Sequence, residues 1–137
     1  MVHQVAATYE ATPENVGLLR DQMAAMAREC GLDETGIADV RLAVSEAATN
    51  ALIHGCRRRP GIIRAHAEIT DGELRIAICD DGPGMAPRTD SPGLGLGLPV
   101  IASVSRRLEI LQDDPGTELR MAFDCPASAA PGSLSDV

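Results

Sequence analysis

The chain has 137 residues, 45% of them hydrophobic and 23% charged, which fits one folded domain with a substantial buried core. A formal net charge of −8 and a single Tyr and a single Phe argue against nucleic-acid binding, because phosphate attraction and base stacking are both weak. We find no apolar run of about 18 residues and no basic-then-apolar N-terminus, so we expect a cytoplasmic protein without a membrane segment.

The cysteines are spread along the chain, at Cys30, Cys56, Cys79 and Cys125. None of them belongs to a CxxC pair, so neither a zinc site nor a disulfide scaffold is expected. We interpret all four as reduced residues.

Residues 3–10 predict a first strand, because apolar side chains alternate with polar or small ones. Thr12 is expected to cap a helix that has Pro13 at its first position and ends at Gly31. A second helix is predicted from about residues 33–35 to about Cys56, with apolar residues at helical spacing. Both apolar stripes should lie on one face of a sheet.

Two alternating runs between residues 62 and 79 predict a hairpin, turned at Asp71-Gly72, a pair that tolerates positive φ angles. Residues 80–92 are rich in Gly and Pro and predict a loop. A third helix is expected over roughly residues 96–107.

A final hairpin is predicted with strands at about 108–112 and 118–123, joined by a Pro- and Gly-containing turn. We therefore expect one domain over residues 1–124, followed by a flexible tail over residues 125–137. The fold class is α+β, a two-layer sandwich of a mixed, mostly antiparallel sheet of about five strands with three helices.

The second predicted helix carries Glu46, Asn50 and His54 at every fourth position, so they project from one side, about 6 Å apart along the axis. An Asn oxygen is a suitable Mg²⁺ ligand, and Glu46 could accept a proton from an attacking hydroxyl. The alternative is a solvated helix face, with His54 only complementing the helix dipole.

Asp80 ends an apolar strand and starts a DxGxG pattern with Gly82 and Gly84. Such a carboxylate can accept a hydrogen bond from an amino group, and the glycines would let a flat ring approach the backbone. The alternative is an ordinary turn, because Asp-Gly and Pro-Gly pairs are common turn formers.

Gly93, Gly95 and Gly97 stand at alternate positions just before the third predicted helix. Unpaired backbone N–H groups at a helix start favour an anion such as a polyphosphate. The pattern is neither a Walker loop nor a dinucleotide fingerprint. The alternative interpretation of these glycines is a flexible hinge.

These motifs occur in one order and are followed by Gly116-Thr117 in the final hairpin. In this order the chain resembles the GHKL ATPase superfamily, the ATP-binding domain shared by histidine kinases, gyrase and MutL. It is most similar there to the small anti-sigma factor serine kinases of bacteria. The resemblance covers about residues 5–123, and residues 43–55 look very like the N-box of that subfamily.

The resemblance implies that Asn50 holds Mg²⁺, that Glu46 acts as the base on a partner's serine or threonine, and that Asp80 and Thr117 hold the adenine of ATP. Gly82 and Gly84 would shape the pocket, and the later glycines would cradle phosphates. The implied partners are a STAS-domain antagonist, which is the substrate, and a sigma factor. Dimers are common in the family.

The segment 85–92 stands where the family carries its ATP lid, and Arg88 is its only basic residue. No helical hairpin with a phosphorylatable histidine precedes the domain, so we do not expect a histidine-kinase fragment. Our leading hypothesis is an ATP- and Mg²⁺-dependent serine/threonine kinase. The alternatives are a nucleotide-gated module that only binds its partner and a hydrolytic ATPase that drives conformational change.

Overall fold

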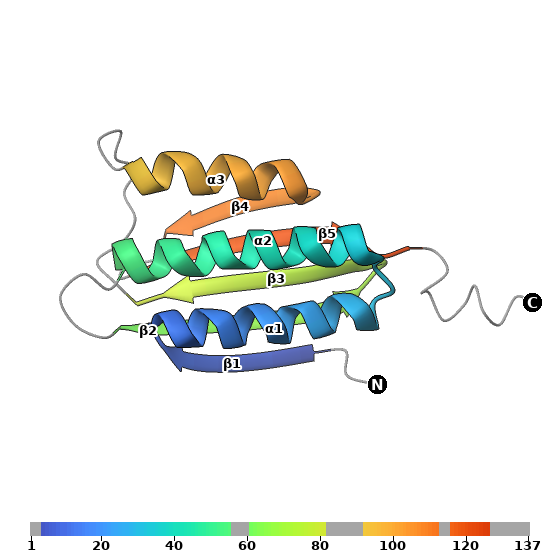
Figure 1. The fold of residues 1–137 in the computed structure, drawn as a ribbon, viewed down its shortest axis with the longest axis horizontal. Coiled ribbons are helices and arrows are strands. Elements are labelled where there is room, and N and C mark those ends of the chain that lie inside the picture. The colour runs from blue at the N-terminus through green and yellow to red at the C-terminus, as the bar shows by residue number, and fades with distance from the viewer. Residues whose placement is uncertain (1–3, 56–60, 82–91, 113–115, 127–137) are drawn as a thin grey trace, which may run out of the picture.

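The computed structural model describes residues 4–55, 61–81, 92–112 and 116–126 (Figure 1). The described residues form five strands, three α-helices and one π-helical turn, η1. In chain order these are β1 (Gln4–Glu10), α1 (Pro13–Glu29), α2 (Glu34–Asn50), η1 (Ala51–Gly55), β2 (Ile62–Thr70), β3 (Glu73–Asp80), α3 (Pro92–Val104), β4 (Arg107–Gln112) and β5 (Thr117–Asp124).

The strands form one sheet in the order β1-β2-β3-β5-β4, and the three helices cover one of its faces (Figure 1). This arrangement confirms the predicted two-layer α+β class. All four strand pairings of the described sheet are antiparallel, so the sheet is simpler than the mixed arrangement we expected. None of the described helices combines the length and apolarity needed to cross a bilayer.

Local capping explains where the first two helices begin. The Thr12 hydroxyl accepts the backbone N–H of Asn15 at 3.2 Å, and Pro13 follows as the first residue of α1. The Asp33 carboxylate accepts the N–H of Gly36 at 2.9 Å and caps α2 in the same way. These two predicted helix starts are confirmed.

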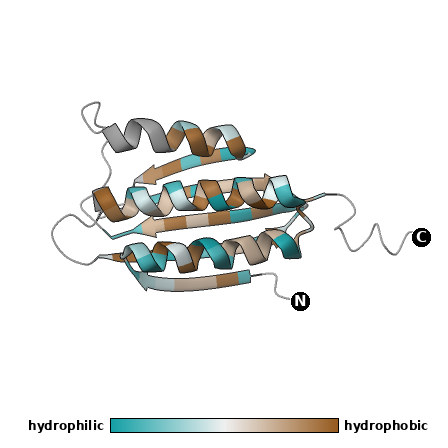
Figure 2. Cartoon of the chain, in the orientation of Figure 1, coloured by the Kyte–Doolittle hydropathy of each residue, from teal (hydrophilic) through white to brown (hydrophobic). Residues whose placement is uncertain are grey.

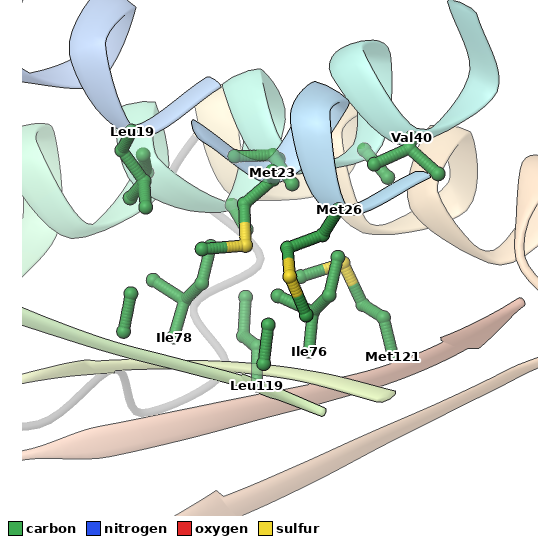
Figure 3. Close-up of a cluster of buried hydrophobic side chains, with 14 of the residues drawn as sticks. Leu19, Met23, Met26, Val40, Ile76, Ile78, Leu119 and Met121 are labelled. Atoms are coloured by element: carbon green, nitrogen blue, oxygen red, sulfur yellow. The ribbon is translucent and has the colours of Figure 1, made fainter. Parts of the chain in front are cut away.

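The core lies between the helices and the sheet (Figure 3). The inner face of the sheet is apolar because every second residue of β2, β3 and β5 points toward the helices. Figure 2 shows hydrophobic and hydrophilic bands alternating along α1 and α2, as expected for helices with one buried side. The labelled core residues in Figure 3 are Leu19, Met23, Met26, Val40, Ile76, Ile78, Leu119 and Met121.

The hairpin between β2 and β3 turns as predicted, with positive φ angles of 53° at Asp71 and 74° at Gly72. This turn fixes the pairing register, in which Ile63 lies opposite Asp80. The predicted hairpin is therefore confirmed, and it places Asp80 at the end of the sheet.

The third helix differs from its prediction, because α3 spans Pro92–Val104 instead of residues 96–107. A proline fits the first turn of a helix, where its missing N–H has no helical partner in any case. After the helix, the Arg106 N–H donates to the Ala122 carbonyl at 2.7 Å, and β4 begins at the next residue. Arg107, the last residue that we predicted to be helical, therefore belongs to a strand.

Three cysteines are described, and their thiols are free. Burial raises the pKa of Cys30 to about 12, with a further contribution from Cys125, and raises the pKa of Cys79 to about 11, with a further contribution from Glu118. Such thiols are weak nucleophiles at neutral pH. Cys56 lies outside the described residues.

On the sheet face opposite the helices, Glu73 of β3 and Arg107 of β4 form a two-bond ion pair across β5. The guanidinium of Arg107 donates at 2.6 and 2.8 Å, and Arg75 adds a third bond at 3.0 Å. Ala122 of β5 lies opposite Arg107, and its small side chain leaves room for the pair to span the strand. Bonds from Arg107 and then Arg75 lower the pKa of Glu73 from 4.5 to about 2.

Replacing Glu73 by Gln should lower the free energy of unfolding at pH 7 by about 1–3 kcal/mol, because a paired and nearly buried charge is lost. A carboxylate whose pKa is lowered on folding stabilises the folded state above its unfolded pKa. This contribution is lost as the pH falls from 4.5 toward 2. Urea unfolding at neutral pH and at about pH 3 should therefore show a smaller acid loss in the variant than in the wild type.

Glu29→Gln, at an exposed position at the end of α1, is the matched control and should change stability by less than about 0.5 kcal/mol. Equal acid sensitivity of the Glu73 variant and the wild type would contradict this account of the ion pair.

Candidate functional site

Four elements meet at one end of the molecule, on the left in Figure 1. There α2 and β3 end, and α3 and β5 begin. The turn η1, which extends α2, lies against β3, and α2 packs against α3. The sequence motifs around Asn50, Asp80 and Thr117, which are far apart in the chain, therefore come to the same end of the fold.

Asp80 and Thr117 are direct partners in the pairing of β3 with β5. Both are almost fully buried, with 4% and 3% of their surface exposed, and both take part in polar interactions. A buried carboxylate needs such interactions, because desolvation strongly disfavours a lone charge. The pair supplies a carboxylate and a hydroxyl that can together receive and donate hydrogen bonds at the end of the sheet.

Gly116, just before Thr117, is needed for this pairing. Its φ angle is +109°, and a Cβ atom added there would lie 2.2 Å from the backbone oxygen of Asp80. No side chain fits such a contact, so the glycine lets β5 approach β3 at the position of the buried carboxylate. The sequence indicated a turn at this glycine but gave no sign of the close approach.

Asp81 is a second residue that sequence reasoning missed. Its carboxylate accepts the backbone N–H of Ile62 at 3.0 Å, and so ties the chain leaving β3 to the start of β2. This bond holds the backbone directly after Asp80 in place. The only sequence signal was a second acidic residue within the Asp80-Asp81-Gly82 turn.

Asn50 is the last residue of α2, and only 3% of its surface is exposed. Its side-chain nitrogen is buried without a hydrogen-bond partner among the described residues. Leaving such a group unpaired costs about 1–3 kcal/mol, so this amide is suited to a bound ligand. A solvated helix face, the alternative weighed for this ridge, does not describe Asn50.

Glu46 lies one helical turn before Asn50 and is half-buried. No ion pair links it to another described side chain. His54 lies in η1, and its side chain is outside the described part of the chain. Because residues 51–55 wind as a π-helix, His54 does not keep the α-helical spacing that placed it on one ridge with Glu46 and Asn50.

The predicted phosphate glycines, Gly93, Gly95 and Gly97, lie in the first turns of α3 and not in a loop before it. Three glycines weaken a helix by about 1 kcal/mol each relative to alanine, so packing against α2 must hold these turns. The predicted Gly82, Gly84 and Arg88, and the lid segment as far as residue 91, lie outside the described residues.

The donor set of the described site fits a hard divalent cation only in part. Across residues 4–55, 61–81, 92–112 and 116–126, no three His, Cys, Asp or Glu side chains gather as a metal cage. Mg²⁺ does not require one, because it keeps waters and takes oxygens from bound phosphates. The side-chain oxygen of Asn50 would be one hard, neutral ligand for such a site.

A family model for the histidine kinase-like ATPase domain matches residues 9–123 of the chain. An anti-sigma F factor of Clostridium acetobutylicum is 34% identical over 123 residues, which cover 81% of this chain and 86% of that protein. An anti-sigma F factor of Clostridium botulinum, strain Alaska E43, is 39% identical over 98 residues, covering 62% of this chain and 68% of the relative.

Solved structures agree with these sequence relatives. The crystal structure of the RsbU and RsbW domains of Rv1364c from Mycobacterium tuberculosis matches 90% of this chain, with a TM-score of 0.72 and 25% identity. Our chain spans 32% of that longer chain. The histidine kinase domain of Erythrobacter litoralis EL346 matches 80% of this chain and 61% of its own, with a TM-score of 0.59 and 22% identity, and shows the fold alone.

Membership of an ATPase family implies that this domain binds a nucleotide. The chain belongs to the histidine kinase-like (GHKL) ATPase superfamily and, within it, to the anti-sigma factor kinase subfamily.

Proposed function

We propose that this protein is an ATP- and Mg²⁺-dependent serine/threonine kinase that regulates a sigma factor in the cytoplasm. Its protein substrate is a STAS-domain antagonist, and it acts as a homodimer. The observation that carries the proposal is the buried Asn50, whose side-chain nitrogen lacks a described partner, one turn after a half-buried Glu46. The names of the curated relatives, anti-sigma F factors, support the regulatory role.

In this proposal the adenine amino group donates to the Asp80 carboxylate, and Thr117 holds the same ring. The burial and register of the two residues support the assignment. Gly82 and Gly84 shape the pocket wall. The start of α3, with Gly93, Gly95 and Gly97, faces the phosphates, because free N–H groups and the helix dipole both favour anions. His54 completes the nucleotide-binding set.

Asn50 contributes its side-chain oxygen to Mg²⁺ and its side-chain nitrogen to a phosphate oxygen, which would satisfy both ends of the buried amide. The cation supplies charge neutralisation for the triphosphate. Glu46 accepts the proton of the acceptor hydroxyl. Phosphoryl transfer depends mainly on positioning and charge stabilisation, so one base and one amide ligand on a single rigid helix are adequate equipment.

A second candidate is a nucleotide-gated module that binds its partner without phosphoryl transfer. It is favoured by the names of the relatives, anti-sigma F factors, which describe an action against a sigma factor. The two functions can be distinguished at Glu46, because only the kinase requires this residue as a base.

Replacing Glu46 by Ala should lower phosphoryl transfer from γ-labelled ATP to STAS-domain proteins by about 10²–10⁴-fold, because the acceptor hydroxyl loses its base. Nucleotide binding, measured by calorimetry, should stay within about twofold, since Glu46 has no role in holding ATP. Glu29→Ala, an exposed acidic position at the far end of α1, is the control and should keep full activity.

Full transfer by the Glu46 variant would remove this residue from its role. Tight binding of a partner protein without any labelling by the wild type would favour the binding module.

Replacing Asp80 by Asn should weaken ATP binding by about 10-fold or more, because a hydrogen bond to a charged acceptor contributes about 1.5–3 kcal/mol. Inorganic triphosphate has no amino group, so its affinity should change by less than about threefold. Competition of both ligands against a fluorescent nucleotide measures the two affinities in one experiment. Equal weakening of both ligands would refute the adenine assignment.

Replacing Gly116 by Ala should weaken ATP binding by about 10-fold or more, because the added methyl group would displace the backbone of Asp80. Gly72→Ala is the matched control. Gly72 also has a positive φ, at +74°, but an added Cβ would meet nothing within 4 Å.

The control should lower the free energy of unfolding by about 1–2 kcal/mol, because alanine is strained at a positive φ, and so should lower the unfolding temperature. It should leave the ATP affinity unchanged. Calorimetry and thermal unfolding of both variants separate the two effects. Loss of affinity in both variants alike would show that general strain, and not the approach to Asp80, controls binding.

A further inference from the structure

Four large hydrophobic side chains are clearly exposed in the part of the chain that the structure describes: Leu18, Leu42, Ile53 and Ile110. Leu42 and Ile53 are 42% and 51% exposed, and they flank Glu46 on α2 and the turn that extends it. Single exposed hydrophobic residues are ordinary, but two on either side of a proposed catalytic base require a reason.

Leu42, Glu46 and Thr49 follow one another at steps of four and three residues, which places them on one side of α2, and Ile53 lies beyond them in η1. We call these four residues the outer ridge. The opposite side of α2 is buried against the sheet, through residues such as Val40 and Val44. Because the buried side of α2 faces the sheet, the outer ridge faces away from it. The helix α2 itself lies between α1 and α3 in the helix layer (Figure 1).

The exposure of Ile53 does not depend on ideal helical spacing. This residue belongs to the π-helical turn, and half of its surface is exposed as the turn actually winds. Both ends of the outer ridge are therefore apolar and open.

The charges around the outer ridge are acidic and unbalanced. Asp39, seven residues before Glu46, lies on the same side of α2, and no ion pair links either carboxylate to another described side chain. Arg41, the only cation of this helix, points sideways to α1 and pairs with Asp21 at 3.3 Å. The outer ridge and the neighbouring Asp39 thus combine two apolar residues with two carboxylates that form no ion pair with another described side chain.

An acceptor hydroxyl must come within about 3 Å of Glu46 for its proton to be taken. The polypeptide on either side of that hydroxyl must then pass over the neighbouring residues of α2. Leu42 stands about 6 Å and Ile53 about 10 Å from Glu46 along the helix axis, within reach of the residues that flank an acceptor serine.

We propose that the outer ridge is the docking surface for the protein substrate, whose acceptor segment carries apolar residues that seat on Leu42 and Ile53 and a basic residue that faces Asp39. This inference rests on the proposed kinase function and adds the residues that recognise the substrate. The acceptor segment fits this surface by complementarity, because an acidic surface with two apolar contacts favours a basic and apolar partner.

The test uses Leu42→Ser and Ile53→Ser, alone and together, in steady-state transfer to the STAS-domain acceptors. Each single variant should raise the KM for the acceptor protein by about 10-fold, and the pair by more, because apolar contact area is lost. ATP affinity by calorimetry should stay the same for Leu42→Ser. The controls are Leu18→Ser and Ile110→Ser, with exposed fractions of 57% and 47%, on α1 and β4.

Both controls should keep the acceptor KM within about twofold. Asp39→Asn should reduce the dependence of this KM on salt, because a charge contact outside the chemistry acts mainly through screened attraction. An unchanged acceptor KM in the double variant, or an equal rise in the controls, would overturn the docking surface while leaving the kinase function intact. Absence of transfer by the wild type would overturn both.

Discussion

The pairing of β3 with β5 at Asp80 and Thr117 is the constraint on which the rest of the site depends. It brings a carboxylate and a hydroxyl together at the end of an apolar sheet and keeps both almost fully buried. The pairing requires Gly116, since no side chain fits against the Asp80 carbonyl. In the chain α3 follows β3, and the start of α3 lies at the end of the sheet where β3 ends (Figure 1).

The two faces of the sheet have separate tasks. The inner face packs against three helices and provides the stability of the fold (Figure 3). The outer face is held by charges, above all by Glu73 and Arg107, which join β3 and β4 across β5. Stability from both faces allows the molecule to keep at Asn50 a buried side-chain nitrogen without a hydrogen-bond partner among the described residues, a local cost that a bound ligand would offset.

Much of the fold could be predicted from the sequence because its signals are local. Thr12 and Asp33 cap their helices through bonds three residues long, and Asp71-Gly72 turns a hairpin through its own φ angles. The predicted bounds of α3 were wrong at both ends, because the helix begins at Pro92 and ends at Val104, and Arg107 pairs as the first residue of β4. The π-helical turn after Asn50 was also missed, because no residue type signals it.

The sequence by itself determined the order of helices and strands, the apolar faces, and the residue types suited to nucleotide chemistry. Only the tertiary structure decided that Asn50 is buried while Glu46 is half-buried. It also decided that Asp80 pairs with Thr117 and that the position of Gly116 excludes every side chain. The physical reason is range. Caps and turns act over a few neighbouring residues, whereas burial and close backbone contact arise between segments far apart in the chain.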